Sequence, residues 1–307
     1  MPHLCLTMAP RPHILVVNGR KVRQPVFVIG APHSGADLLA RALKHSPGFH
    51  VTVGQRSVMS VVYAFARSPS IQRGRGEAAA TVLRDAFAQA WQVTAHGCLA
   101  CSQVCREAGE LNGTGTCIAE RDIRRYGDAS PDLMYCAEGL VDAFPDARIV
   151  QIIRDGRDVV AAMLADAESM AWFKPGVANV DSEFPNPFFG IETASDLAAW
   201  PGLSLAGKCA MRWRGSVRTM ARLRNSMPAE RLTTLRYEQV IRQPAVATRA
   251  VSGFIGADLA AIGTRARGRV DPVTVQSGGW RRTLTPQQVT DVEQVAGIDL
   301  RRVGYGA

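Results

Sequence analysis

The stretch Pro25-Val-Phe-Val-Ile-Gly30-Ala-Pro-His33-Ser-Gly35-Ala-Asp-Leu-Leu-Ala-Arg-Ala-Leu43 decides the fold of this chain. It begins with apolar, β-branched residues, a pattern typical of a buried parallel strand. A glycine-containing turn follows, and apolar residues then recur at the spacing of a helix. A turn of this kind leaves backbone N–H groups at the helix N-terminus, where the helix dipole favours an anion. We therefore expect the turn to bind a negatively charged group.

A second joint of the same form lies about 120 residues further along the chain and reads Arg148-Ile-Val-Gln-Ile-Ile-Arg154-Asp-Gly-Arg157-Asp-Val-Val-Ala-Ala-Met163. Arg154 falls at the C-terminal end of the expected strand, which is the edge where open α/β sheets bind ligands. Two such joints in one sheet predict a cleft for a doubly anionic ligand.

The first turn is not a Walker A loop. That motif needs G-x-x-x-x-G-K-[ST], whereas Gly30 and Gly35 are followed here by Ala36 and Asp37. The missing Lys and the missing magnesium-binding hydroxyl argue against ATP or GTP hydrolysis, and they make a kinase the weakest hypothesis.

Three later segments extend the pattern, in the order Gly127-Asp-Ala-Ser-Pro131 with Phe144-Pro-Asp-Ala-Arg148, then Leu232-Thr-Thr-Leu-Arg-Tyr237-Glu238 with Pro244 and Phe254-Ile-Gly256, then Ser277-Gly-Gly-Trp280-Arg-Arg282 with Leu284-Thr-Pro286. Together with the two joints they cover roughly residues 25 to 300. In this order the five segments resemble the nucleotide-dependent sulfotransferase family, whose donor is 3′-phosphoadenosine 5′-phosphosulfate.

The resemblance implies a single domain over residues 1–307 with a three-layer α/β/α fold, a central and mostly parallel sheet, and a P-loop-like first turn. It also implies that the first turn wraps the 5′-phosphosulfate of the donor, that Arg154 binds the 3′-phosphate, that Tyr237 helps to hold the adenine, and that the loop of Trp280 and Arg281 covers the nucleotide. The donor-binding positions implied in this way are Pro32, His33, Ser34, Gly35, Ala36, Asp37, Arg154, Ala162, Tyr237, Gly279, Trp280 and Arg281.

Several of these positions depart from the family pattern. His33 stands where the family has Lys or Arg, Ala36 and Asp37 replace two Thr, Ala162 replaces a Ser, and Ala129 replaces a Lys. Because nearby phosphates raise the pKa of a histidine, His33 is expected to act as an acid toward the leaving oxygen.

The base that takes the acceptor proton is left open among three residues. Asp128 is the catalytic candidate named beside His33, and His50 and Asp37 are alternatives. Asp128 also fits a helix or turn cap before Ser130, and His50 also fits an ordinary, partly buried histidine.

Two functions therefore remain. One is a working sulfotransferase that acts on a hydroxyl of a small molecule or saccharide, for which secondary metabolism is an expected setting. The other is a repurposed module that binds a nucleotide or another anion, because fold alone does not fix function.

A cysteine-rich insertion is expected over residues 96–117. Cys98, Cys101, Cys105 and Cys117 have a spacing that could hold structural zinc or an iron–sulfur cluster. The first three also stand at i, i+3 and i+7, which is one face of a helix, and small apolar thiols are common on core faces. Packed free thiols are favoured over a metal, and no disulfide is expected in a reducing cytoplasm.

The composition is that of an ordinary globular protein, with 47% hydrophobic and 21% charged residues. The net charge is +9, and because only four of the 36 basic residues are Lys, the other 32 are Arg. No block of like charges indicates nucleic-acid binding, and no apolar run is long enough for a membrane span. A cytoplasmic location is expected, and the oligomeric state cannot be inferred.

Residues 172–207 are rich in Pro, Gly and aromatic residues and show no clear periodicity. Such a segment in a compact domain is usually a functional lid, so we expect an acceptor-binding flap here, facing helices between residues 57 and 95. Elsewhere the pattern predicts a hairpin at Asn18-Gly19, helices over 133–143 and 208–225, and a buried strand over 232–236.

Overall fold

A computed structural model describes residues 14–72, 76–94, 98, 101–111, 115–174, 176–263 and 277–306. Its centre is a five-stranded sheet formed by β3 (Val26–Gly30), β4 (Phe49–Thr52), β5 (Arg125–Asp128), β6 (Arg148–Ile153) and β7 (Leu232–Arg236). The strands lie in the order β4-β5-β3-β6-β7, and every pair is parallel. The predicted parallel α/β fold is confirmed.

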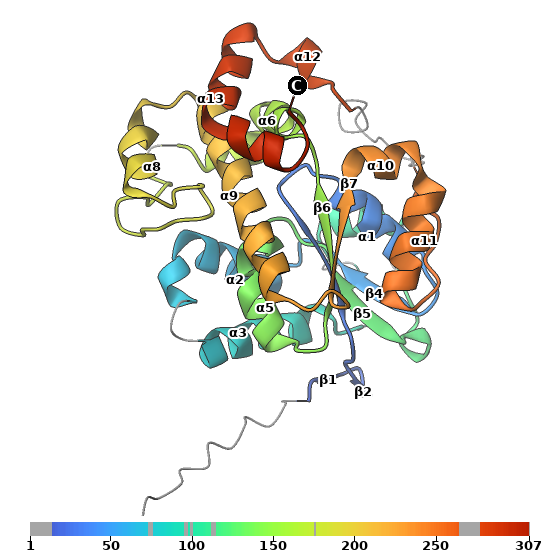
Figure 1. The fold of residues 1–307 in the computed structure, drawn as a ribbon. Helices are drawn as coiled ribbons and strands as arrows, with labels where there is room; N and C mark the ends of the chain where they lie inside the picture. Colours follow the sequence, from blue (N-terminus) through green and yellow to red (C-terminus); the bar gives the residue numbers. More distant parts are fainter. Residues whose placement is uncertain are drawn as a thin grey trace, which may run out of the picture.

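Helices cover both faces of the sheet, as Figure 1 shows. One face carries α1 (Ala36–Lys44), α10 (Tyr237–Arg242) and α11 (Pro244–Ile255), and the other carries α2 (Arg56–Arg67), α3 (Gly76–Ala90), α5 (Ala137–Ala143), α6 (Gly156–Ala165), α9 (Leu205–Ser226) and α13 (Pro286–Arg302). Shorter elements join them: η1 (Pro69–Ile71), α4 (Gln103–Ala108), η3 (Glu120–Asp122), η4 (Leu133–Cys136), α7 (Ala167–Ala171), α8 (Ala194–Ala199), η5 (Trp200–Gly202) and α12 (Trp280–Thr283). None of the described helices is long and apolar enough to cross a membrane.

The sheet separates two apolar cores, one under each layer of helices. The larger core contains an aromatic cluster in which Phe27 of β3 contacts Phe87 and Phe144, with ring centroids 5.1 and 5.3 Å apart. Trp91 packs into the same cluster, and its indole N–H donates to the carbonyl of Gly127 over 3.0 Å. Strands β3 and β6 are buried on both faces, which explains why they read as continuous apolar runs.

The two predicted joints lie side by side, because β3 and β6 are direct neighbours that pair from Val26 and Arg148 to Gly30 and Ile152. A Cβ on Gly30 would lie 2.7 Å from the carbonyl oxygen of Ile152, so glycine permits this close approach. Both turns therefore leave the same edge of the sheet.

The predicted hairpin is confirmed: β1 (Val16–Val17) and β2 (Arg20–Lys21) are antiparallel, and Asn18 and Gly19 both have positive φ. Two boundaries differ from the prediction. The 133–143 segment begins as the 3₁₀ turn η4 before α5, and α9 begins at Leu205 because the Ser204 hydroxyl caps it. Strand β7 lies at the sheet edge and is only partly buried, whereas a buried strand was predicted.

The segment 172–207 packs more tightly than an open lid. Phe188, Phe189 and Trp200 are buried in a third apolar cluster together with Met211 of α9. Helix α8 inside the segment starts with a capping box between Thr193 and Asp196. The carboxylate of Asp196 also accepts a hydrogen bond from Arg214 of α9 over 2.5 Å, which fixes the segment to the domain.

Candidate active site

The turn between β3 and α1 adopts a backbone that only some residues tolerate. His33 has a φ of 59° and Gly35 a φ of 97°. A Cβ on Gly35 would lie 2.4 Å from the ring of Tyr237, so this residue must be glycine both for its φ and for its contact. Ser34 is buried, and its hydroxyl has no hydrogen-bond partner among the described residues. The turn thus presents a hydroxyl and the first N–H groups of α1, the groups expected to bind a phosphate.

Arg154 connects the second turn to the first. Its side chain is buried, and Nη1 donates to the carbonyl oxygen of His33 over 2.9 Å. The guanidinium lies 4.4 Å from the centroid of the Tyr237 ring, a cation–π contact. The indole N–H of Trp213 donates to the Arg154 carbonyl over 3.2 Å. Arg154, which the resemblance assigns to the 3′-phosphate, is therefore in contact with His33, which it assigns to the 5′-phosphosulfate.

Arg157 has a different role from Arg154. It forms two hydrogen bonds with the Asp155 carboxylate, at 3.0 and 2.9 Å, and donates to the carbonyl of Tyr305. The Asp155 N–H in turn donates to Glu238, whose other oxygen accepts from the Tyr305 hydroxyl. This network fixes the start of α6 to α10 and to the C-terminal segment.

The loop that carries Gly279, Trp280 and Arg281 docks on the first turn of α6. The Asp158 carboxylate accepts from the N–H groups of Gly278 and Trp280 over 2.7 and 2.9 Å. The Trp280 ring lies 4.3 Å from the Arg157 guanidinium. The loop is thus held close to Arg154, although none of its residues lines the cavity described next. Ala162 is buried within α6 and does not line the cavity either.

A cavity of about 350 Å³ opens at the edge of the sheet where both turns end. Its walls come from the end of β3, the first turn and the start of α1, the segment 129–132, Arg154 after β6, and helices α7, α9 and α10. The lining residues include Pro32, His33, Ser34, Gly35, Ala36, Asp37, Ser130, Asp132, Arg154, Asp166, Ser169, Trp172, Arg212 and Tyr237, together with Tyr63 of α2. Most of the donor positions implied by the sequence therefore share one cavity.

His33 is held by a carboxylate that the sequence analysis did not single out. Its Nε2 lies 3.3 Å from the Asp166 Oδ2 and 3.3 Å from the hydroxyl of Ser169. Ser169 donates to the same carboxylate oxygen over 2.6 Å. Burial lowers the pKa of His33, which outweighs the opposing effect of Asp166, and Arg212 lowers it further. Desolvation is the largest effect on the pKa of His33, and the role of His33 as an acid toward a bound phosphate stays a prediction.

A buried ion pair forms another wall. Arg212 of α9 donates to the Asp132 carboxylate over 2.6 Å, and both side chains are almost fully buried. Asp132 has a φ of 58°, a conformation that non-glycine residues rarely adopt. This pair is not evident from the sequence, because Arg212 lies 80 residues from Asp132. The chain also contains 32 Arg residues, and no motif distinguishes Arg212 from the others.

The three base candidates are not brought together. Asp128 is fully buried and does not line the cavity; it accepts hydrogen bonds from the hydroxyl of Thr52 and from the N–H of Ser130. This is the turn-capping arrangement considered as its alternative. Burial raises the pKa of Asp128 to about 7. His50 is also buried, with its pKa lowered to about 4 by burial. Asp37 does line the cavity, on the exposed first turn of α1.

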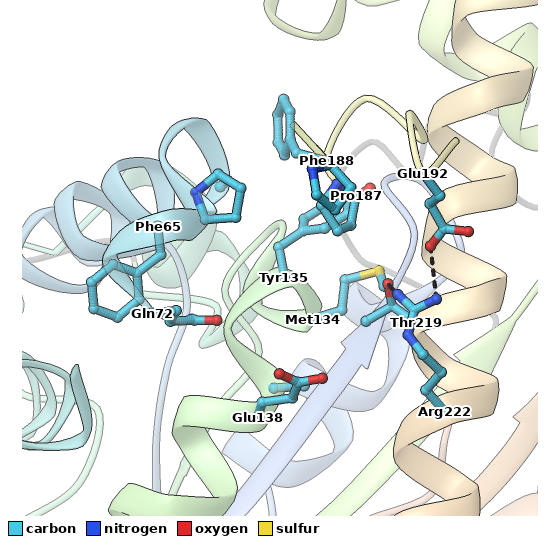
Figure 2. Close-up of a pocket in the computed structure, with 14 residues that line it drawn as sticks. Phe65, Gln72, Met134, Tyr135, Glu138, Pro187, Phe188, Glu192, Thr219 and Arg222 are labelled. Atoms are coloured by element: carbon cyan, nitrogen blue, oxygen red, sulfur yellow. Dashed lines mark hydrogen bonds and ion pairs between the residues drawn. The ribbon is translucent and has the colours of Figure 1, made fainter. Parts of the chain in front are cut away.

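A second cavity of about 380 Å³ lies between α2, η4 and the 172–207 segment (Figure 2). Phe65, Met134 and Pro187 give it an apolar lining, and at its rim the carboxylate of Glu192 pairs with Arg222 at 2.7 Å. Phe188 lines this cavity, and its ring lies 4.8 Å from that of Trp172, which lines the first cavity. The 172–207 segment therefore contributes to both cavities.

The cysteine residues of the insertion gather in one cluster beside β4. The Cys98 sulfur accepts from the Cys117 N–H over 3.0 Å, and the Lys44 ammonium lies 3.3 Å from the Cys105 sulfur. A hydrogen bond from the Cys101 thiol lowers the pKa of Cys105. The expected single helical face is wrong, because Ser102 caps α4 and only Cys105 lies in that helix. None of these thiols forms a disulfide among the described residues, and within the same ranges no three His, Cys, Asp or Glu side chains are arranged to hold a metal ion.

Comparison with known proteins identifies the family. Residues 25–186 match the model of the Sulfotransferase family, which is more than half of the chain. No curated protein sequence matches the chain.

Similar solved structures include the sulfotransferase domain of an olefin synthase from Synechococcus PCC 7002, at 14% identity and a TM-score of 0.44 over 89% of this chain and 94% of that one. A mouse sulfotransferase complexed with PAP has 13% identity and a TM-score of 0.43, over 91% and 86%. A retinol dehydratase in complex with androsterone and PAP has 11% identity and a TM-score of 0.37, over 94% and 82%. On the match of the family model, the chain belongs to the sulfotransferase family.

Proposed function

We propose that this protein transfers a sulfuryl group from 3′-phosphoadenosine 5′-phosphosulfate to a hydroxyl of a small-molecule or saccharide acceptor. The observation that carries the proposal is the junction of the two turns, where Arg154 donates to the carbonyl of His33 over 2.9 Å inside one cavity. A donor with phosphates at both ends of an adenosine needs two anion-binding turns side by side. Parallel neighbours β3 and β6 provide that arrangement.

The donor would lie with its 5′-phosphosulfate on the first turn and its 3′-phosphate toward Arg154. The N–H groups at the start of α1 and the hydroxyl of Ser34 suit the former. Arg154 suits the latter because a guanidinium binds phosphate through two parallel hydrogen bonds. Tyr237, whose buried ring packs against Gly35 and Arg154, would help to hold the adenine by fixing the position of both groups.

In the reaction, the oxygen of the acceptor hydroxyl attacks the sulfur of the donor. A new S–O bond forms to the acceptor as the S–O bond to the 5′-phosphate breaks, and the electron pair of the broken bond stays on that phosphate. The products are the sulfate ester, 3′,5′-bisphosphoadenosine (PAP) and the hydroxyl proton, which a base must accept. Most of the rate is expected from positioning and electrostatics, as in phosphoryl transfer.

We assign the base role to His33 rather than to Asp128. A neutral imidazole can accept a proton, and burial keeps the pKa of His33 low. Asp166 holds the imidazole and would stabilise it once it is protonated, as a carboxylate does beside a catalytic histidine. Asp128, by contrast, lies outside the cavity lining with both oxygens engaged.

The acceptor is proposed to enter along the wall formed by Tyr63 of α2 and Trp172 of the 172–207 segment. These rings line the donor cavity and pack against each other, with centroids 4.8 Å apart, a position that suits the flap role proposed for the segment. Aromatic walls of this kind favour an acceptor with an apolar or ring-shaped body.

The test has two parts. Calorimetry should show PAP binding with a dissociation constant in the micromolar range, and donor labelled in its sulfuryl group should transfer the label to an acceptor from a panel of phenols, alcohols and sugars. Absence of PAP binding at tens of micromolar would overturn the proposal. Binding without transfer to any acceptor would favour the alternative of a nucleotide-binding module.

A further inference from the structure

We infer that Arg212 binds the sulfuryl oxygens of the donor and stabilises their charge during transfer. This inference rests on the proposed function. It assigns a catalytic role to a residue on α9, a helix that lies outside every segment on which the family resemblance was based. The starting point is the loss of positive charge at two positions, where His33 and Ala129 replace cationic residues of the family pattern.

The Arg212 side chain is 1% exposed and lines the same cavity as His33 and Arg154. Only its Nη2 has a partner in the Asp132 carboxylate; its Nε and Nη1 have none among the described residues. A buried guanidinium with unused donors is unfavourable, and such donors in a native structure call for a ligand or another explanation.

Contacts with two neighbouring side chains, Phe188 and Asp132, fix the position of this guanidinium. Its Cζ lies 4.1 Å from the centroid of the Phe188 ring, and Asp132 fixes one edge. Burial lowers the pKa of Arg212, but Asp132 and the nearby Tyr135 hydroxyl together raise it by more, so the net shift of the pKa is upward. Asp132 also comes three residues after Ala129, the position at which the family has its Lys. A cation is thus returned to that part of the cavity from another helix.

The field of Arg212 reaches the reacting end of the cavity, because it lowers the pKa of His33. The leaving 5′-phosphate would lie on the first turn, in which His33 accepts a hydrogen bond from Arg154 through its carbonyl oxygen. As the S–O bond to the 5′-phosphate breaks and the bond to the acceptor oxygen forms, negative charge on the sulfuryl oxygens would face the unused N–H groups of Arg212. Fixed donors aimed at developing charge are an effective form of catalysis in a desolvated site.

The experiment compares two ligands that differ only in the sulfuryl group. The affinities of PAP and of the intact donor are measured by calorimetry, without acceptor, for the wild type and for the double variant Asp132→Asn with Arg212→Met. The double change removes both charges, so no unpaired buried charge remains. We expect the affinity for the intact donor to fall by about 30-fold, that for PAP to change by less than about threefold, and kcat to fall by about 100-fold or more.

Two further variants keep the test decisive. Arg212→Lys preserves the charge and serves if the double variant does not fold; it should give a smaller loss, again only for the intact donor. Arg218→Met breaks another Arg–Asp pair on the same helix, with Asp299 at 2.9 Å, outside the cavity lining. It should leave both affinities unchanged.

Three results would overturn the inference. Equal losses for PAP and the intact donor would indicate a structural role for Arg212. Unchanged affinity for both, with a raised KM for the acceptor, would place Arg212 in the acceptor site. An unchanged kcat would exclude a catalytic role. If the wild type itself bound neither ligand, the proposed function would fail, a result distinct from all three.

Discussion

The two ends of the cavity are built in different ways. At the donor end, Arg154 and Tyr237 contact each other and the Gly35 turn, and every one of these residues stands where the family resemblance placed it. At the end proposed to hold the sulfuryl group, His33, Asp166 and Arg212 come from three separate elements. His33 departs from the family pattern, and Asp166 and Arg212 lie outside the segments that carry the resemblance. In the proposed function, short motifs of the family would bind the nucleotide, and the groups proposed around the sulfuryl would lie outside those motifs or depart from them.

This difference indicates that backbone geometry restricts which residues can bind a nucleotide. It does not restrict in the same way which residues stabilise the charge of a transferred group. The turn must approach Tyr237 and Ile152 closely, so glycine and a fixed strand order are required. A cation near the sulfuryl group can come from any neighbouring helix, provided that its charge is desolvated and held, as Asp132 holds Arg212.

The largest effect is expected from His33 at the sulfuryl end. His33→Ala should lower kcat by about 10³-fold while leaving the PAP affinity within about threefold, because general-base catalysis contributes on that scale. Asp166→Asn should lower kcat less, with the same unchanged PAP affinity.

The pH profile tests the role of His33. With His33 as the base, kcat/KM should fall as the pH drops through the lowered histidine pKa and should stay level at neutral pH. A profile that instead falls as the pH rises would mean that His33 acts as an acid. A His33→Ala variant with unchanged turnover would show that His33 is not the base.

At the donor end, Arg154→Met should weaken PAP binding by about 100-fold, the scale expected when a desolvated cation that pairs with phosphate is removed. Calorimetry with PAP measures it, and thermal unfolding checks the fold. The Arg218→Met variant serves as the matched control on an arginine outside the cavity. A loss of PAP affinity below about fivefold would contradict the proposal that Arg154 binds the nucleotide at this end of the cavity.

Between the two ends, Trp172→Ala should raise the KM of the acceptor found in the transfer assay by about 10-fold and leave the PAP affinity unchanged, because its ring lies against Tyr63 at the proposed entrance. Trp172→Phe keeps an aromatic contact with Phe188 and should cost less. An effect on PAP affinity instead would assign Trp172 to the donor end.

The smallest effect on turnover is expected from Asp128→Asn, at about twofold or less. Such a result would assign Asp128 to the structural framework rather than to either end of the cavity. Its effect should lie in stability. The pKa of Asp128 is raised to about 7, so folding favours the protonated form. The resulting stabilisation is present at acidic pH and is lost as the pH rises to about 7.

Urea unfolding at pH 5 and pH 8 measures this pH dependence. The wild type should lose about 1 to 3 kcal/mol more than the variant between the two pH values. A large loss of kcat in Asp128→Asn would restore Asp128 as the base.

The donor end could be predicted from sequence because its signals are local. Each turn combines an apolar strand, a glycine and a helix within about 20 residues, and parallel pairing then brings Arg154 beside His33. The roles that the resemblance assigned to all of these residues stay predictions, and Ala162 and the loop at Trp280 lie outside the cavity lining.

The sulfuryl end could not be predicted, because its partners are distant in sequence. Asp166 lies 133 residues after His33, and Arg212 is one of 32 arginines. Sequence alone does not show that Asp128 and His50, the two base candidates outside the first turn, are buried and lie outside the cavity lining. The cysteine spacing suggested a helical face, which the cap at Ser102 prevents.

The contact between Gly35 and Tyr237 has a consequence for how the protein is made. The ribosome releases the first turn long before residue 237 emerges, yet that turn cannot take its finished shape until β7 joins the sheet edge and delivers the tyrosine. A truncated product that ends at residue 186 would contain the whole matched family segment and still lack Arg212 and Tyr237, which both line the cavity. We therefore expect the nascent chain to bind nucleotide only after β7 has paired with β6 and Tyr237 has packed against Gly35.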